Sequence, residues 1–324
     1  MDPICHTLVG ASLGCTGLEH RSRYSRATLM IAANLPDIDV VAQFAGGTAT
    51  YAVRRGVTHG IPALIVLPFL LTMAVMLWHR WRGKVASEIP FSARWTYILA
   101  CIGVWSHPTL DWLNTYGMRW LMPIVDEWYY GDTLFIIDWI LWVVLAAGLL
   151  ASRGAFARSL AWYARPATLA LYFLVGYAVA NYTLTDLAER RAMTVLADNP
   201  PDRLLASPVP FTPLRREVIL EYPDHYLFAD YNYVSAEDFR LRDRRVDKGD
   251  SRLLDVVSST RDGRWFMHWV RFPYVLTERA STGWEIRVVD ARYIPDIANP
   301  RLDGFAVFSM QVPTLPDGAE PGSP

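Results

Sequence analysis

The sequence contains few cysteines and no excess of positive charge, and each shortage excludes a class of protein. Only three cysteines occur in 324 residues, all in apolar stretches: Cys5, Cys15 and Cys101. Their spacing excludes a disulfide framework and a CxxC zinc ribbon. The net charge of −1 argues against a nucleic-acid partner, which requires a basic stripe. The chain opens Met1-Asp2-Pro3 without a basic segment, so we expect no cleaved signal peptide there.

Apolar residues are abundant, and they are concentrated in the first 185 residues. The hydrophobic fraction of 52% is high for a soluble enzyme, whereas 19% charged residues are too many for a chain embedded wholly in lipid. Four strong apolar runs have about the length of a minimal membrane span: 61–78, 95–113, 133–151 and 166–184. Two weaker stretches, 4–18 and 27–45, precede them. We therefore predict an α-helical membrane domain over residues 1–185, with four strong helices and two short or re-entrant helices.

The basic residues between these runs predict an orientation in the membrane. Ten of them lie in alternate loops that share one side of the membrane: Arg21, Arg23, Arg26, Arg80, Arg82, Lys84, Arg94, Arg153, Arg158 and Arg165. The intervening loops hold only three: Arg54, Arg55 and Arg119. Because positive charges favour the cytoplasmic side, the pattern fits six crossings with the N-terminus outside. If the two weak stretches do not cross, the four strong spans alone predict the same placement of the later loops. The chain after residue 185 would then lie outside the cytoplasm, attached to a multi-pass membrane domain.

The composition changes to that of a soluble domain after residue 185. Prolines within 186–213 predict an extended linker. Beyond it lie six short runs rich in β-forming residues: 217–222, 226–234, 253–258, 264–272, 284–290 and 305–312. Asp262-Gly263 and Thr282-Gly283 predict turns between them. We expect a small mainly-β soluble domain over 214–312 and a disordered tail over 313–324.

Two pairs of polar residues could hold a metal ion. His107 and Asp111 are four residues apart and would share a helix face, where imidazole and carboxylate can converge on one ion. The alternative is a buried His–Asp hydrogen bond that ties helices together. Asp37 and Asp39, in a loop or first helical turn, can reach one or two cations. Alternatively, Asp37 caps a helix that starts at Pro36, and Asp39 is solvated or supports a ligand.

The predicted topology brings the candidate residues to one face of the membrane. The residues at ends facing the extracytoplasmic side are His6, Asp37, Asp39, His59, His107, Asp111 and Asp138. Neutral imidazoles and carboxylates suit Zn²⁺, and Mn²⁺ or Fe²⁺ less well. Three protein ligands and an open position would let the ion activate water for hydrolysis. His20 and His79 fall at cytoplasmic ends, and we expect His225 and His268 to be surface or strand residues.

Several short motifs, taken together in order, resemble a known family. They are Asp2-Pro-x-x-His6, Asn34-x-Pro-Asp-x-Asp39, Arg55-Gly-x-Thr-His59, His107-Pro-x-x-Asp111, Asn114-x-Tyr-Gly117, Asp132-x-x-Phe-x-Ile-Asp138, Ser207-Pro-x-Pro, Arg271-Phe-Pro and Asp290-Ala-Arg-Tyr293. The set is similar to the membrane-bound metal-dependent hydrolases, which include the YdjM-like inner-membrane proteins, once known only as a domain of unknown function. That family is in turn distantly similar to zinc-dependent phospholipase C and P1-type nucleases.

The resemblance implies a set of metal ligands. They are His6, Asp37, His59, His107 and Asp111. The soluble enzymes carry a second His-x-x-x-Glu helix that this chain lacks, so one or two divalent ions, Zn²⁺ foremost, are expected rather than three. Asp132 and Asp138 could substitute for the missing ligands, and Asp138 could equally be a structural carboxylate. We expect Asp39 and Arg55 to be the catalytic residues.

The expected function is hydrolysis of a phosphoester, in a lipid or lipid-linked substrate, at the extracytoplasmic face of the inner membrane. Arg54, Arg55 or Arg119 could pair with the phosphate. A transporter is one alternative, because intramembrane His and Asp residues can form an ion path; against it, the cytoplasmic halves of the predicted spans are nearly uncharged. Another alternative is a non-catalytic binding or regulatory protein, in which the metal is structural and the β domain meets a partner.

Overall fold

The computed structural model describes residues 1–45, 49–83, 88–293 and 306–316, and these fall into two compact units. The helical unit consists of Met1–Val41, Val53–Thr185 and Ser207–Pro213. The sheet unit consists of Ala42–Ala52, Asp186–Ala206 and Leu214–Pro324. The main division after Thr185 falls where the composition of the sequence changes, although each unit also includes a short segment from the other part of the chain.

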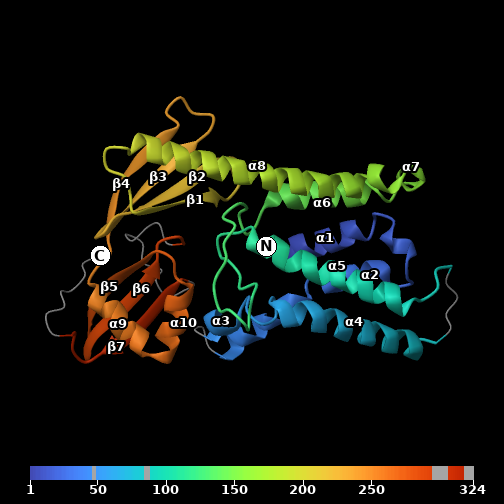
Figure 1. The fold of residues 1–324 in the computed structure, drawn as a ribbon, viewed down its shortest axis with the longest axis horizontal. Coiled ribbons are helices and arrows are strands. Elements are labelled where there is room, and N and C mark those ends of the chain that lie inside the picture. Colours follow the sequence, from blue (N-terminus) through green and yellow to red (C-terminus); the bar gives the residue numbers. More distant parts are fainter. Residues whose placement is uncertain (46–48, 84–87, 294–305, 317–324) are drawn as a thin grey trace. The chain divides into compact units, whose positions relative to one another are not determined.

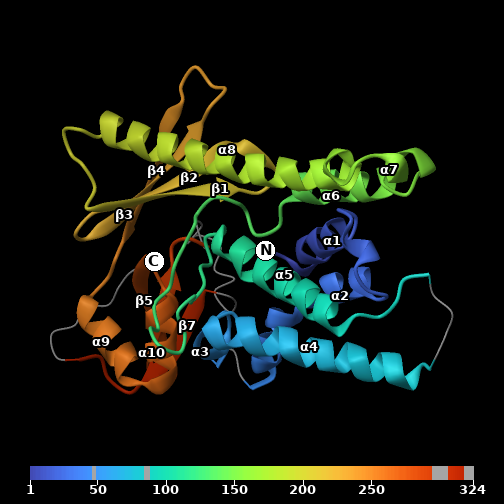
Figure 2. The same cartoon turned by 45° about the vertical axis from the view of Figure 1, so that its right-hand side comes forward.

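The helical unit is built from helices that run side by side in both views (Figure 1, Figure 2). They are α1 (Pro3–Leu13), α2 (Ser25–Ala32), α4 (Ile61–Trp81), α5 (Ala93–Trp112), α6 (Trp139–Ala151) and the first part of α8 (Pro166–Val195). Shorter helical segments lie between them in the chain: the 3₁₀ helices η1 (Leu18–His20), η2 (Leu35–Ala45) and η3 (Trp162–Ala164), and the helices α3 (Ala49–Val53) and α7 (Ala155–Ser159). Asp2 caps α1, because its carboxylate accepts hydrogen bonds from two N–H groups of the first turn.

Two glycines let α2 pack closely between α1 and α5. A Cβ atom on Gly10 of α1 would lie 2.7 Å from the carbonyl oxygen of Leu29, and one on Gly103 of α5 would lie 2.5 Å from Cβ of Ala32. Small residues at such contacts allow helix backbones to approach one another. The contact therefore fixes the position of the C-terminal end of α2, and η2 follows directly after it.

Two helices in the described part of the chain, α4 and α8, are long and apolar enough to cross a membrane. The prediction of four strong membrane helices is therefore wrong, and so is the count of six crossings that depended on it. The run 95–113 does form helix α5. Its sequence is too polar to qualify as a span, however, because it carries Arg94 at one end and His107 and Asp111 at the other.

The third predicted span, 133–151, is shortened by a helix cap. Helix α6 begins only at Trp139, because Asp138 Oδ1 accepts hydrogen bonds from two N–H groups of its first turn at 3.0 and 3.2 Å. Its 13 residues extend about 20 Å at the usual rise per residue, which is less than the roughly 30 Å of a bilayer core. The weaker stretches give shorter helices still: 4–18 contains most of α1, and 27–45 contains the end of α2 and η2.

The sheet unit contains two antiparallel sheets. In the first sheet, neighbouring strands follow one another in the chain: β1 (Arg203–Val209), β2 (Thr212–Glu221), β3 (His225–Asn232) and β4 (Phe239–Asp247). The second sheet has the same simple order: β5 (Pro273–Ala280), β6 (Gly283–Asp290) and β7 (Val307–Val312). Two helices lie between the sheets in the chain, α9 (Ser251–Ser259) and α10 (Arg261–Trp269).

The expected strands are found in part. The runs 217–222, 226–234, 284–290 and 305–312 overlap β2, β3, β6 and β7, and the first residue of the last run lies outside the described residues. The predicted linker, 186–213, contains the end of α8 and strand β1. Strands β4 and β5 were not expected. Of the predicted disordered tail, residues 317–324 also lie outside the described residues.

Two predicted strands, 253–258 and 264–272, are wrong, because these residues lie largely in α9 and α10. The domain is therefore a mixture of sheets and helices. Polar caps explain the difference: Asp250 Oδ1 accepts a hydrogen bond from the first turn of α9 at 2.9 Å, and Thr260 Oγ1 accepts one from Gly263 at 3.0 Å. Gly263, expected in a turn, lies in the first turn of α10, where a Cβ atom would meet the Val257 carbonyl oxygen at 2.0 Å.

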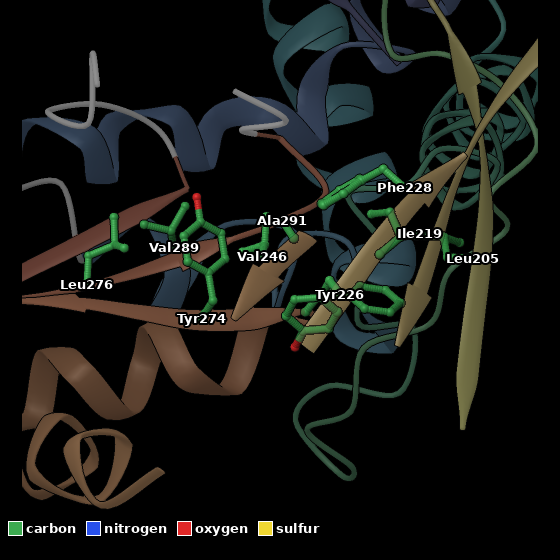
Figure 3. Packing of buried hydrophobic residues seen from close by; sticks show 10 residues of the cluster. Leu205, Ile219, Tyr226, Phe228, Val246, Tyr274, Leu276, Val289 and Ala291 are labelled. Atoms are coloured by element: carbon green, nitrogen blue, oxygen red, sulfur yellow. The ribbon is translucent and has the colours of Figure 1, made fainter. Parts of the chain in front are cut away.

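The two sheets share one hydrophobic core, shown in Figure 3. Leu205, Ile219, Tyr226 and Phe228 enter it from the first sheet, and Tyr274, Leu276 and Val289 enter it from the second. Tyr226 also donates a hydrogen bond from its hydroxyl to the carbonyl oxygen of Pro273 at 2.9 Å. The sheets are thus joined by packing and by a polar contact, and they form a single folded unit.

Replacing Asp290 with alanine is expected to destabilise the sheet unit by about 3–5 kcal/mol, because it would remove the carboxylate that is paired with a buried guanidinium. Asp290 and Arg292 have side chains that are 0% and 1% exposed, and their closest atoms are 2.6 Å apart. Thermal unfolding of the detergent-solubilised protein measures the change. Asp247→Ala is the control, because its partner Arg245 is exposed and such pairs contribute at most about 1 kcal/mol. Equal shifts in the two variants would contradict the prediction.

Candidate metal centre

Helix α5 presents His107 and Asp111 on the same face, one turn apart, as the sequence spacing predicts. Both side chains are fully buried, and His107 Nε2 lies 3.6 Å from Asp111 Oδ2. Pro108 lies between them in the chain without ending the helix, which continues to Trp112. The same helix that packs against α2 through Gly103 therefore also carries two candidate ligands.

Two further candidates, Asp37 and His59, join this pair from separate segments. His59 lies just before α4, and its Nε2 atom is 3.1 Å from His107 Nε2 and 3.5 Å from Asp111 Oδ2. Asp37 belongs to η2, and its Oδ1 atom lies 3.6 Å from His107 Nε2 and 3.9 Å from His59 Nε2. One potential ligand atom from each of the four residues lies within 4.8 Å of the other three. We call these four residues the metal cluster.

The spacing within the metal cluster matches a coordination shell. Nitrogen and oxygen ligands lie about 2.0–2.2 Å from Zn²⁺, so neighbouring ligands of a tetrahedral site are separated by roughly 3.3–3.6 Å. The distances given above range from 3.1 to 3.9 Å. The remaining pair, Asp37 and Asp111, has ligand atoms within 4.8 Å of each other, so the four residues could hold a single ion.

Hydrogen bonds on the outer side of both imidazoles turn their Nε2 atoms toward the centre. His107 Nδ1 lies 2.7 Å from the carbonyl oxygen of Ala33, which only accepts, so Nδ1 carries the proton. His59 Nδ1 lies 3.0 Å from Thr58 Oγ1, and the Thr58 hydroxyl is 2.9 Å from Asp39 Oδ2 and donates to it. His59 Nδ1 is then the donor to Thr58, and its Nε2 is left unprotonated.

His59 Nε2 and His107 Nε2 are only 3.1 Å apart, so they repel each other unless a proton or a cation lies between them. Burial lowers the pKa of His59 below its usual value, which favours the neutral form that binds metals. Burial acts in the same direction on His107, but the carboxylates of Asp111 and Asp37 outweigh it and raise the pKa of His107 to about 9. A divalent cation can take the place of the proton on that imidazole, so the residues present fit a divalent cation. A partner that fixes the tautomer of a ligating histidine is also a usual part of such sites.

Arg55 and Asp39 lie beside the metal cluster and contact its members. Arg55 Nε is 2.9 Å from Asp111 Oδ2, and its Nη1 donates to Asn114 Oδ1 at 2.9 Å and to the Gly117 carbonyl oxygen at 3.1 Å. Its backbone N–H donates to Asp39 Oδ2 at 2.8 Å. Arg55 has a φ of +51°, a conformation that costs a non-glycine residue about 1–3 kcal/mol. Surrounding contacts thus hold this buried arginine in a strained conformation.

His6, the fifth predicted ligand, is not one of the four residues of the metal cluster, but it contacts two of them. Its Nε2 atom is 3.2 Å from Asp111 Oδ1, whereas the metal cluster is next to Oδ2. Its ring stacks on His107 with centroids 3.8 Å apart, and the amine of Met1 also contacts Asp111 Oδ1. His6 therefore contacts both Asp111 and His107 without being one of the four residues of the metal cluster.

The remaining candidates have other contacts in the structure. Asp138 caps α6 through Oδ1 and accepts a hydrogen bond from the Tyr177 hydroxyl through Oδ2 at 3.0 Å. The backbone carbonyl of Asp132 accepts from Thr185 at 3.2 Å. Arg119 donates to Asp126 and to the Arg54 carbonyl oxygen. None of Asp132, Asp138, His20, His79, His225 and His268 belongs to the metal cluster found among the described residues.

Three supporting groups were not singled out from the sequence. Thr58 and Asn114 belong to the ordered motifs Arg55-Gly-x-Thr-His59 and Asn114-x-Tyr-Gly117. Their place in these motifs is the sequence feature that could have pointed to a role. The third group, the carbonyl of Ala33, belongs to the backbone. Every residue has such a group, so the type of residue at position 33 could not have predicted the contact. The position of this carbonyl depends on the close packing of α2 against Gly103.

Comparison with known proteins identifies a family. The family model described as YdjM inner membrane protein matches residues 1–186, which include every residue of the metal cluster. No curated protein and no solved structure matches the chain. The description of this family gives a location in the membrane and does not state an activity. It covers more than half of the 324 residues, and together with α4 and α8 it identifies a membrane protein: the chain belongs to the YdjM inner membrane protein family.

Proposed function

We propose that this protein is a metal-dependent hydrolase of phosphoesters held in the inner membrane. The observation that supports the proposal best is the meeting of two imidazole nitrogens with two carboxylates in the metal cluster. Such a set suits a divalent ion, and Zn²⁺ in particular. A bound ion would act as a Lewis acid and activate water for attack on an ester.

The burial of the cluster suggests the side from which a substrate approaches. The side chain of Asp37 is 17% exposed, whereas those of His59, His107 and Asp111 are fully buried. Zn²⁺ bound by four protein atoms can take a fifth ligand. A substrate oxygen would therefore reach the centre beside Asp37, which is the accessible edge of the cluster.

Asp39 and Arg55, which we expected to be catalytic, are better suited to positioning the ligands. Asp39 lies on the outer side of the His59 ring, 3.4 Å from Nδ1, and it also holds the Thr58 hydroxyl and the Arg55 N–H. Arg55 holds Asp111 through Nε and partly offsets the negative charge of that carboxylate. In this proposal Asp39 orients His59, and Arg55 orients Asp111.

The basic residues support an extracytoplasmic location for the metal cluster. Arg80 and Arg82 lie at the C-terminal end of α4, and Arg153 and Arg165 precede α8. If both helices cross the membrane, these ends share the cytoplasmic side by the positive-inside rule. The N-terminal end of α4, which follows His59, and the chain after α8 would then lie on the outer side.

The purified protein is expected to hydrolyse a phosphoester only while metal is bound. Removing the metal with a chelator should lower the rate by more than about 100-fold, because a bound ion contributes several kcal/mol to catalysis, and Zn²⁺ should restore it. The assay uses bis-p-nitrophenyl phosphate and a phospholipid in detergent. Metal-loaded protein that turns over neither substrate would contradict the proposal.

A metal-stabilised binding or regulatory protein is the second candidate. One specific observation favours it: four protein ligands complete a tetrahedral shell, and structural zinc sites are closed in this way. In that case the chelator would lower the thermal unfolding temperature, and the metal-loaded protein would have no phosphoesterase activity. The same preparation therefore distinguishes the two candidates.

A further inference from the structure

A cleft of about 460 Å³ lies in the helical unit along one face of α1. Its volume is typical of small-molecule sites. Its walls are formed by Leu8 and Ala11 of α1, Met30 of α2 and Leu149 of α6, and the larger part of its surface is apolar. The cleft extends from Thr7 to Cys15, a length of about 12 Å at the usual helical rise. It can therefore hold part of a hydrocarbon chain.

The two charged residues that line this cleft lie together at one end. Arg26 is in the first turn of α2, and Arg153 lies two residues after the end of α6. Both line the cleft together with Cys15, which lies just beyond the C-terminal end of α1. Among the residues that the structure describes, no carboxylate forms an ion pair with either arginine. Arg26 donates one hydrogen bond, from Nε to the Gly14 carbonyl oxygen. The cleft thus combines an apolar interior with a cationic end.

A second cleft of about 550 Å³ adjoins this cationic end and shares Arg26. Arg23, Tyr24 and Arg165 also line it, and Arg165 is paired with Glu19 at 2.6 Å. Positive charge therefore exceeds negative charge around Arg26. Nearby on α6, Val143 and Leu150 are more than half exposed, as expected for a helix whose surface meets lipid in an inner membrane protein.

We infer that the α1 cleft binds an anionic phospholipid of the bilayer, with an acyl chain along Leu8, Ala11 and Met30 and the phosphate between Arg26 and Arg153. Guanidinium groups bind phosphate through paired charge-assisted hydrogen bonds. A soluble phosphate compound would leave the apolar walls without a partner. A zwitterionic lipid would add the positive charge of its choline beside the two arginines. This site is separate from the metal cluster and does not depend on the proposed hydrolysis.

Native mass spectrometry of the full-length protein in detergent tests the inference, with phosphatidylglycerol and phosphatidylcholine as probes. The unchanged protein is expected to retain phosphatidylglycerol in preference to phosphatidylcholine. Arg26→Ala with Arg153→Ala should weaken phosphatidylglycerol binding by about tenfold or more, because hydrogen bonds to charged groups contribute about 1.5–3 kcal/mol each. Metal content should stay unchanged, so failure here is distinguishable from failure of the metal centre.

A matched control removes the same charge elsewhere. Arg80→Ala with Arg82→Ala takes two arginines from the end of α4, outside the cleft, and should leave lipid binding within about twofold of the unchanged protein. If the first double variant does not fold, Ala11→Phe keeps both arginines and fills the cleft, and it should also lose the lipid. Equal retention of both lipids, or equal loss in the two double variants, would overturn the inference.

Discussion

Protein carrying His107→Ala is expected to purify without its metal ion. His107 supplies one of the four atoms of the metal cluster, and its ring is held in place by the Ala33 carbonyl oxygen. We expect metal affinity to fall by more than about 100-fold, because loss of a group that merely orients a ligand already costs about 10–100-fold. Elemental analysis of the purified protein, followed by titration with Zn²⁺, measures the effect.

His79→Ala is the matched control for this experiment. His79 lies in the last turn of α4, where its ring stacks on Phe91 with centroids 4.5 Å apart, and it is not part of the metal cluster. This variant should hold as much metal as the unchanged protein. If His107→Ala also retained full metal content, the four-residue centre would be wrong, whatever activity the protein has.

The sequence predicts the parts of the candidate site that depend on local geometry. Residues four apart on a helix must share a face, so the approach of His107 to Asp111 follows from their spacing alone. The arrival of Asp37 and His59 beside them depends on tertiary packing. It was expected from a six-crossing topology that is wrong, and from the ordered motifs. The resemblance carried by those motifs does not depend on the number of membrane spans, so the error in the topology does not affect it.

The errors in the predicted fold arise where one polar residue overrides an apolar or β-forming pattern. Asp138 starts α6 six residues into the predicted span, and hydropathy alone cannot place that cap. Thr260 caps α10, which begins at Arg261, three residues before the predicted strand 264–272, whose Trp and Phe residues favour a strand. In both cases a single side-chain oxygen satisfies free N–H groups at a helix start. The pattern of residues identified the segments correctly as ordered but assigned the wrong boundary or type.

Gly103→Leu is expected to lose metal even though the substitution touches no ligand. A Cβ atom at this position would lie 2.5 Å from Ala32 Cβ and 2.9 Å from the Leu29 carbonyl oxygen, so α2 must move away from α5. The movement would carry the Ala33 carbonyl away from His107 and displace η2, which holds Asp37. Overpacking typically costs about 1–3 kcal/mol and sometimes more. We therefore expect a lower unfolding temperature together with loss of bound metal.

Gly176→Leu separates this packing effect from the general effect of a larger residue in a helix. Gly176 lies in α8, and no atom within 4 Å would meet a Cβ atom there. Because leucine favours helix by about 0.8–1 kcal/mol over glycine, this control should fold at least as well as the unchanged protein and keep its metal. Metal retained by Gly103→Leu at the level of this control would show that the position of α2 does not govern the centre. If Gly103→Leu loses metal and Gly176→Leu does not, the result would show that His107 depends on the backbone carbonyl of Ala33, at the end of α2.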